Sequence, residues 1–162
     1  MIGMIAAIGK NRELGKDNKL LWRVPSDMKF FKKTTMGHKV IMGVNTYKSL
    51  PPTGLPGRKM IVITKQEKEN SENVKFVSSI NQIIEDYLES EEEVFIIGGA
   101  SIYQQFLPYV KYMYITELDF ECLTADVYYP EFDKTEWQSN LLEEGNSNSI
   151  DYKIYKYIRK KN

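Results

Sequence analysis

The chain has 162 residues, of which 42% are hydrophobic and 27% charged, a length and composition typical of one globular domain. Its 22 basic and 22 acidic residues balance, whereas a nucleic-acid-binding protein usually carries a basic excess to neutralise phosphates. One cysteine, Cys122, and one histidine, His38, exclude an internal disulfide and leave too few ligands for a common zinc site. We therefore expect a protein of a reducing, cytoplasmic compartment with no metal and no nucleic-acid partner. We also expect no membrane association, because no apolar run approaches the ~20 residues of a membrane helix.

The first predicted elements are a strand, a long loop and a helix. Residues 2–8 form a continuous apolar run, which indicates a central strand buried on both faces. Residues 9–24 are irregular, and a loop of this length in a compact domain is often functional. Pro25 suits the first turn of a helix, where its missing N–H would be unpaired anyway. This helix is expected to run to about Met36 and to end at Gly37.

The rest of the chain alternates between short apolar strands and short helices. The expected strands are 40–42, 60–63, 74–77, 94–97 and 110–118, and the expected helices are 45–50, 79–87 and 100–107. Residues 137–143 and 150–159 predict antiparallel strands that end the chain. The pattern therefore predicts one α/β domain over residues 1–162: a mostly parallel central sheet, helices on both faces and an antiparallel C-terminal hairpin.

Asp27 is the first residue that indicates chemistry. It lies in the first turn of a predicted helix, where the helix dipole alone commonly favours a carboxylate. However, Phe30, Phe31 and Thr34 follow at helical spacing and share its side of the helix. An acid among aromatic side chains resists ionisation, so its pKa should rise, which suits proton chemistry. A carboxylate can also hold a planar N–C–NH2 edge through two parallel hydrogen bonds.

Two predicted strands end in segments that open helices, Gly98-Gly99 and Gly43 to Thr46. Free N–H groups and the helix dipole favour a phosphate at such a junction, and glycine lets the ligand approach the backbone. Each junction alone is equally an ordinary strand-to-helix turn, because neither GxGxxG nor a P-loop is present. Ligands gather at the carboxyl ends of parallel strands, so the two junctions together fit a ligand with two phosphates.

Single residues elsewhere allow two interpretations. Arg58, after Pro56-Gly57, is either a surface arginine or a fixed fork for a substrate carboxylate. Trp22 is either an anchor for the long loop or part of a ligand wall. His38 is predicted to lie on the surface with no role, and nothing near Cys122 marks it as a nucleophile.

Taken in chain order, the motifs are IAA at 5–7, GKDN at 15–18, WRVPSD at 22–27, VIMG at 40–43, Thr46, LPGR at 55–58, IGG at 97–99, Ile102-Tyr103 and YIT at 114–116. Their order and spacing resemble the bacterial dihydrofolate reductases. The likeness extends from residue 2 to about residue 130, and the C-terminal strands fit that family's closing hairpin. It implies a monomeric enzyme that transfers a hydride from NADPH to C6 of 7,8-dihydrofolate, giving 5,6,7,8-tetrahydrofolate, and that binds antifolate inhibitors.

The resemblance also implies roles for the substrate residues. Asp27 would bind the pterin's 2-amino group and N3 and favour protonation of N5 by a water, supported by a hydrogen bond from Thr116. Arg58 would bind the α-carboxylate of the glutamate tail. The implied substrate-binding residues are Ile5, Ala6, Asp27, Met28, Phe31, Leu50, Leu55, Arg58 and Ile97, of which Ile5 and Ile97 act through their backbone carbonyls.

The implied nicotinamide site lies under the long loop. The loop from Gly9 to Val24 would close over the ring, which excludes water and sets the reacting carbons at transfer distance. Leu20, Trp22 and Tyr103 join Asp27 and Thr116 as implied catalytic residues, with Tyr103 stabilising developing positive charge. The implied cofactor-binding residues are Ala7, Leu14, Gly15, Asn18, Lys19, Leu20, Gly43, Val44, Asn45, Thr46, Thr64, Lys65, Gly98, Gly99, Ala100, Ser101, Ile102 and Tyr103.

The chain departs from the family pattern where the 2′-phosphate of NADPH would bind. Val44, Ser78 and Ser101 stand where basic residues are frequent, and Lys65 restores one positive charge. We therefore expect NADPH as cofactor, with weaker discrimination against NADH than is usual. Residues 125–127 also differ, so the switching of the closing loop that they contact is expected to differ.

Three other functions are weighed against this one. A related reductase of a pyrimidine intermediate in flavin synthesis has a ribose phosphate on its substrate and needs no clamp such as Arg58. A protein that binds nucleotide or folate without turnover is supported only by the departures in the loop and phosphate site. A structural or nucleic-acid role gains nothing from the neutral charge.

Overall fold

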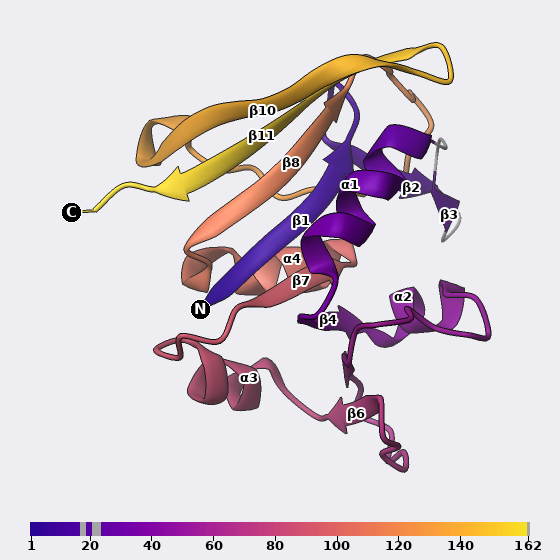
Figure 1. Ribbon diagram of the computed structural model, residues 1–162, viewed down its shortest axis with the longest axis vertical. Coiled ribbons are helices and arrows are strands. Elements are labelled where there is room, and N and C mark those ends of the chain that lie inside the picture. Colours follow the sequence, from indigo (N-terminus) through magenta and orange to yellow (C-terminus); the bar gives the residue numbers. More distant parts are fainter. Residues whose placement is uncertain (17–18, 21–23, 162) are drawn as a thin grey trace.

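The computed structural model describes residues 1–16, 19–20 and 24–161, and at residues 15, 16, 19 and 20 it describes the backbone alone. An eight-stranded sheet has the order β10-β11-β8-β1-β7-β4-β5-β6 (Figure 1). Its strands are β1 (Ile2–Ile8), β4 (Lys39–Gly43), β5 (Met60–Ile63), β6 (Val74–Val77), β7 (Val94–Gly98), β8 (Tyr112–Leu118), β10 (Trp137–Ser147) and β11 (Ile150–Arg159). The helices are α1 (Pro25–Thr35), α2 (Val44–Ser49), α3 (Ile80–Tyr87) and α4 (Ala100–Phe106), with 3-10 turns η1 (Leu107–Tyr109) and η2 (Lys134–Glu136).

The strand directions confirm the predicted α/β fold. The neighbours from β8 through β1, β7, β4 and β5 to β6 pair in parallel. The two antiparallel pairs, β8 with β11 and β11 with β10, lie together at the other end of the sheet. Parallel strands point the same way, so their carboxyl ends form one edge of the sheet, and ligands bind along that edge in open α/β folds.

Helices cover both faces of the sheet because successive residues of a strand point to opposite faces. Met4 of β1 packs into a cluster with residues of α3 and α4. Ile5, the next residue, packs into a second cluster with residues of α1 and α2. Both side chains are buried, at 0% and 5% exposure, which explains why the strand is apolar throughout instead of alternating.

The prediction of a loop over residues 9–24 is wrong in part. Glu13–Lys16 forms β2 and Lys19–Leu20 forms β3, which join β9 (Val127–Tyr128) in a small antiparallel sheet of order β3-β2-β9. Glycine and charged residues give this segment little strand character of its own. Its pairing comes instead from a partner strand more than a hundred residues later, which local sequence does not reveal.

Other boundaries shift by a few residues. The strand expected from 110 begins at Tyr112, because Pro108 lies in η1 just before it. The strand expected to end at 143 continues to Ser147, past a register shift between Leu141 and Glu143. The predicted stop of the first helix at Gly37 is confirmed: α1 ends at Thr35, and Gly37 has the positive φ of 81° that suits glycine.

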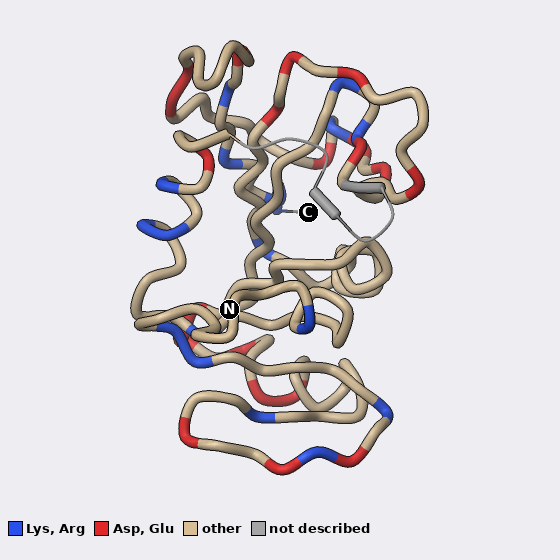
Figure 2. The backbone as a smooth tube through the Cα atoms, turned by 90° about the vertical axis from the view of Figure 1, so that its right-hand side faces the viewer, with Lys and Arg blue, Asp and Glu red and all other residues tan. Residues whose placement is uncertain are grey.

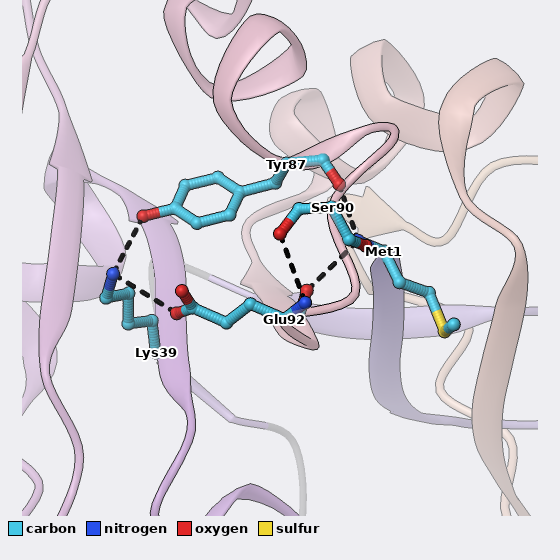
Figure 3. A network of polar contacts seen from close by, with 5 residues as sticks. All are labelled: Met1, Lys39, Tyr87, Ser90 and Glu92. Atoms are coloured by element: carbon cyan, nitrogen blue, oxygen red, sulfur yellow. Dashed lines mark hydrogen bonds and ion pairs between the residues drawn. The ribbon is translucent and has the colours of Figure 1, made fainter.

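A polar network fastens the edge of the sheet opposite the carboxyl ends (Figure 3). The Met1 ammonium donates to the backbone carbonyls of Tyr87, Ser90 and Glu92. Partial burial lowers the pKa of this amine. Lys39 donates to the Tyr87 hydroxyl and pairs with Glu92, both at 3.1 Å. The turn after α3 is thereby tied to the starts of β1 and β4.

Charges of both signs are interspersed along the loops at the two ends of the view in Figure 2. None of the helices that the structure describes has the length and apolarity required to cross a membrane.

Candidate active site

The carboxylate of Asp27 is held between the first turn of α1 and the central strand β8. Thr116 of β8 donates its hydroxyl to Asp27 Oδ1 at 2.6 Å, and Thr116 is itself 2% exposed. Burial raises the pKa of Asp27, as the sequence predicts, while the hydrogen bond from Thr116 opposes the rise by favouring the anion. The site therefore holds a carboxyl group that takes up a proton more readily than an exposed aspartate.

β1 lies between β8, which carries Thr116, and β7, which leads into α4. Tyr103 of α4 donates its hydroxyl to the carbonyl of Ile5 at 2.8 Å and is 4% exposed. Burial raises the pKa of Tyr103, and the negative charge of nearby Asp27 adds to the rise. The resemblance assigns the Ile5 carbonyl to the substrate's amino group. Here this oxygen also accepts from Tyr103, which its second lone pair permits.

The two predicted strand-to-helix junctions lie side by side. β4 and β7 are neighbours with Met42 opposite Gly98, so Gly43 and Gly98 end their strands together. Gly98 has a φ of +130°, and a Cβ added to it would lie 3.5 Å from Thr46 Oγ1. At Gly99 the corresponding distance is 3.6 Å. The hydroxyl of Thr46 thus faces the glycine pair across space that side chains at these positions would fill.

Arg58 is fixed and buried, so its interpretation as a surface arginine is wrong. Its side chain is 7% exposed, and burial lowers its pKa. Nε and Nη2 both donate to the Pro56 carbonyl, at 3.1 and 3.0 Å, and Nη1 donates to Thr35 Oγ1 at 3.2 Å. The guanidinium also lies 6.0 Å from the ring of Phe31. Among the described residues, no acidic side chain forms an ion pair with it.

The residues that follow β4, β5 and β7 carry few charges. Thr64 follows β5 and is 9% exposed, with its hydroxyl accepting from the Gln66 N–H at 3.2 Å. Lys65, next to it, is exposed. Ser101 of α4 is exposed and accepts from the Gln105 side chain, whereas Val44 packs against the α1-side cluster. Of these strand-end residues, only Lys65 offers a positive charge.

The remaining predicted residues differ in how fully the structure describes them. Asn18 and Trp22 lie outside the described residues, and of Gly15, Lys19 and Leu20 only the backbone is described. Met28 is 49% exposed. Those that line the same strand ends or pack beside them, buried or half-buried except for the exposed Asn45, are Ala6, Ala7, Leu14, Phe31, Asn45, Leu50, Leu55, Ile97, Ala100 and Ile102.

A hollow of about 1150 Å³ lies apart from this site. Charged residues of both signs line it, among them Lys10, Arg12 and Lys134. Each of the three forms an ion pair with an acidic side chain of the same hollow. Three of its four basic residues are thus matched by acidic neighbours, so the hollow offers little free positive charge to an anionic ligand.

Two buried polar residues were missed in the sequence, and His38 differs from its prediction. Thr35 follows Asp27 and Phe31 at spacings of four, so the helical periodicity that marked this face extends to it. Glu13 is 0% exposed and accepts from the N–H groups of Asn11 and Cys122, at 2.6 and 2.7 Å. No local pattern marks Glu13 as buried.

His38 is half-buried rather than exposed, with its ring 5.3 Å from that of Phe95.

Comparison with known proteins agrees with this geometry. The chain matches the family model for dihydrofolate reductase over residues 1–159. It is 38% identical to a dihydrofolate reductase of Bacillus subtilis over 99% of this chain and 95% of that protein. It is 37% identical to those of Staphylococcus haemolyticus and Neisseria gonorrhoeae, each over 98% of this chain and 95% and 98% of the relatives. The chain therefore belongs to the dihydrofolate reductase family, oxidoreductases that reduce dihydrofolate with a nicotinamide cofactor.

Proposed function

We propose that this enzyme, as one domain over residues 1–162, uses NADPH to reduce 7,8-dihydrofolate by adding a hydride at C6 and a proton at N5. The observation that carries the proposal is the buried carboxylate of Asp27, with Thr116 bonded to one oxygen at 2.6 Å. The other oxygen and the outer lone pairs remain for a ligand. A carboxylate so placed accepts two parallel N–H bonds from the amino-pyrimidine edge of a pterin.

Asp27 assists the proton step through its environment. A dihydropterin becomes a better hydride acceptor when N5 is protonated, and a nearby anion favours that cation. Burial disfavours the free carboxylate and so strengthens its interaction with a cationic ligand. In this proposal Asp27 stays bound at the 2-amino group and N3, and a water delivers the proton to N5.

Arg58 supports recognition of the substrate's tail. It is a buried cation held by the backbone and by Thr35, with no described acidic partner. Such a group binds a carboxylate strongly, because the guanidinium is already largely out of water and only the carboxylate loses its hydration on binding. Phe31, Leu50 and Leu55 would form the wall between this end and Asp27, with Met28 at its exposed margin.

The glycine pair and Thr46 fit a dinucleotide. NADPH supplies the hydride when it is bound. Gly98 and Gly99 leave open space in front of Thr46, so a pyrophosphate can approach the backbone N–H groups at the starts of α2 and α4. Tyr103 is held by Ile5 in the same corner, where its oxygen favours positive charge on a neighbouring ring. The backbone of β2 and β3 would cover the reacting atoms and exclude water.

The test is turnover with product identification. The absorbance of NADPH should fall when dihydrofolate is added, and mass spectrometry should find tetrahydrofolate carrying deuterium at C6 when deuterated NADPH is the donor. Tight binding of both ligands without turnover would instead support the protein that binds and does not react. Binding of antifolate inhibitors, a monomeric state, a cytoplasmic location and the lack of a nucleic-acid partner stay predictions of the same proposal.

A further inference from the structure

Thr35 is a buried hydroxyl that joins two parts of the proposed substrate site. It is the last residue of α1 and is 0% exposed. Its Oγ1 donates to the carbonyl of Phe31 at 2.8 Å and accepts from Arg58 Nη1 at 3.2 Å. Since a guanidinium has no acceptor, the single hydroxyl proton must point to Phe31, and a lone pair must face Arg58. The direction of both bonds is therefore settled by their chemistry.

The contacts of Arg58 show what Thr35 contributes. The guanidinium has five N–H bonds in a rigid plane, and the Pro56 carbonyl takes one from Nε and one from Nη2. Both of these N–H groups lie on one edge of the guanidinium, so the two bonds alone would still allow the plane to rotate about that edge. Thr35 holds the opposite nitrogen, Nη1. One N–H then remains on each terminal nitrogen, and a carboxylate can accept two N–H bonds from a guanidinium.

The turn that carries Arg58 is docked on the same end of α1. The N–H of Gly37 donates to the carbonyl of Gly57 at 3.1 Å, and the N–H of Arg58 to that of Leu55 at 3.2 Å. Gly57 has a φ of +81° and lies against the side chain of Met36, where a Cβ would not fit. The backbone of the turn is thus fixed without Thr35, so the hydroxyl acts on the Arg58 side chain rather than on the fold of the turn.

We propose that Thr35 is a positioning residue for the substrate's carboxylate: it holds the Arg58 guanidinium in the orientation that presents two parallel N–H bonds. The inference rests on the proposed role of Arg58. Being fully buried, Thr35 does not itself touch the substrate. It therefore affects binding of the glutamate tail and not the chemistry at the pterin ring.

The experiment compares Thr35→Val, which keeps the shape and removes the hydroxyl, with Thr35→Ser, which keeps the hydroxyl. Each is assayed with dihydrofolate and with 6-methyl-7,8-dihydropterin, which has the same reacting ring and no tail. For Thr35→Val we expect the KM for dihydrofolate to rise about tenfold, the loss typical of one bond to a charged group, with kcat changed less than about twofold. We expect kcat/KM for the truncated substrate to stay at the wild-type value and Thr35→Ser to behave as wild type.

A double-mutant cycle with Arg58→Leu separates this inference from the function on which it rests. Once Arg58 is replaced, Thr35→Val should raise the KM for dihydrofolate no further. If Arg58→Leu alone leaves that KM unchanged, the proposed role of Arg58 fails. The positioning role is overturned if Thr35→Val weakens the binding of both substrates equally, if it lowers kcat, or if it raises the KM for dihydrofolate by the same factor in the Arg58→Leu background. In each of these cases Thr35 only supports the helix. Should Thr35→Val not fold, Thr35→Ala removes the same hydroxyl without placing a methyl beside Arg58.

Discussion

The carboxyl group of Asp27 combines a functional position with a cost to stability. Burial disfavours its anion, and the hydrogen bond from Thr116 offsets only part of this, so its pKa in the folded state is raised. At pH values between the ordinary carboxyl pKa and the raised one, Asp27 has lost its proton in the unfolded chain but still keeps it in the folded chain. Stability therefore falls as pH rises through that window, and it stays lower above it.

Asp27→Asn should accordingly make the protein more stable at neutral pH, because the amide is buried without a charge and its oxygen still accepts from Thr116. The gain in free energy of unfolding should shrink as the pH falls toward about 4, near the ordinary carboxyl pKa, where the wild-type group is protonated too. Urea unfolding of both proteins across this range measures it. A variant less stable than wild type at pH 7 would mean that the anion is stabilised by its surroundings.

The residue pairs of the site show which contacts can be predicted from nearby sequence and which cannot. Asp27 and Phe31 share a helix face by spacing alone, and Thr35 extends it. Thr116 lies 89 residues from Asp27, and only the resemblance connected them. The burial of Arg58 follows from a turn docked on the end of α1, which no spacing within the turn reveals.

At the level of elements, the carboxyl ends of β4, β5 and β7 form the proposed cofactor site, and among the described residues 43–46, 64–65 and 98–103 the one basic residue is Lys65. An NADPH 2′-phosphate carries a charge of about −2 near neutral pH, so it needs cations to offset its loss of water. Val44 opens α2 beside this edge and supplies none. The enzyme should therefore distinguish NADPH from NADH only weakly.

Val44→Arg should raise the ratio of kcat/KM for NADPH over NADH about tenfold by adding a charge-assisted hydrogen bond, with the NADH value little changed. Lys65→Ala should lower the same ratio. Steady-state assays with each cofactor at fixed dihydrofolate measure both. A wild-type preference of several orders of magnitude that survives Lys65→Ala would show that other groups bind the phosphate.

Glu13 of β2 accepts two charge-assisted bonds from backbone N–H groups: that of Asn11, two residues before it, and that of Cys122, which links β2 to the segment before β9. Glu13→Gln keeps the shape but turns an NH2 group toward one of these donors. The free energy of unfolding should fall by about 1–3 kcal/mol, the cost of an unsatisfied buried group. Glu121→Gln is the control: Glu121 bonds the Asn11 side chain at the surface, and its loss should cost about 0.5 kcal/mol or less. Equal stabilities of the two variants would contradict the link.

The elements were predictable to different degrees for identifiable reasons. β1, β5 and β7 are apolar throughout and were found within a residue or so, because burial on both faces leaves little choice of side chain. β2 and β3 were missed because their own residues, Gly15 and several charged side chains among them, do not favour a strand. β2 becomes a strand by pairing with β9, far along the chain. α1 was found from Pro25 and Gly37, which suit a helix start and end for reasons within the backbone.

At the scale of the whole molecule, the two ligand positions divide between elements. Asp27 and Arg58 belong to α1 and the turn docked on it, whereas the glycine pair lies between β7 and α4 and Thr46 lies in α2, which follows β4. A ligand at one hundred times its dissociation constant adds about 2.7 kcal/mol to the folded state. For a chain of this size that raises Tm by roughly 5–10 °C.

NADPH and dihydrofolate should therefore each raise Tm, and Asp27→Asn should reduce the shift from dihydrofolate while leaving that from NADPH intact. Differential scanning fluorimetry with each ligand alone measures this. If Asp27→Asn abolished both shifts, the two ligands would not occupy separate groups of residues.

The most direct test of the account is the pH profile of NADPH oxidation by dihydrofolate in the wild type and in Asp27→Asn. Loss of a group that assists proton transfer typically costs about 10²–10⁴-fold in rate, so kcat of the variant should collapse at neutral pH. It should recover in part at low pH, where dihydrofolate is protonated in solution before it binds. A variant with wild-type kcat at neutral pH, or one whose loss is the same at every pH, would contradict the role given to Asp27.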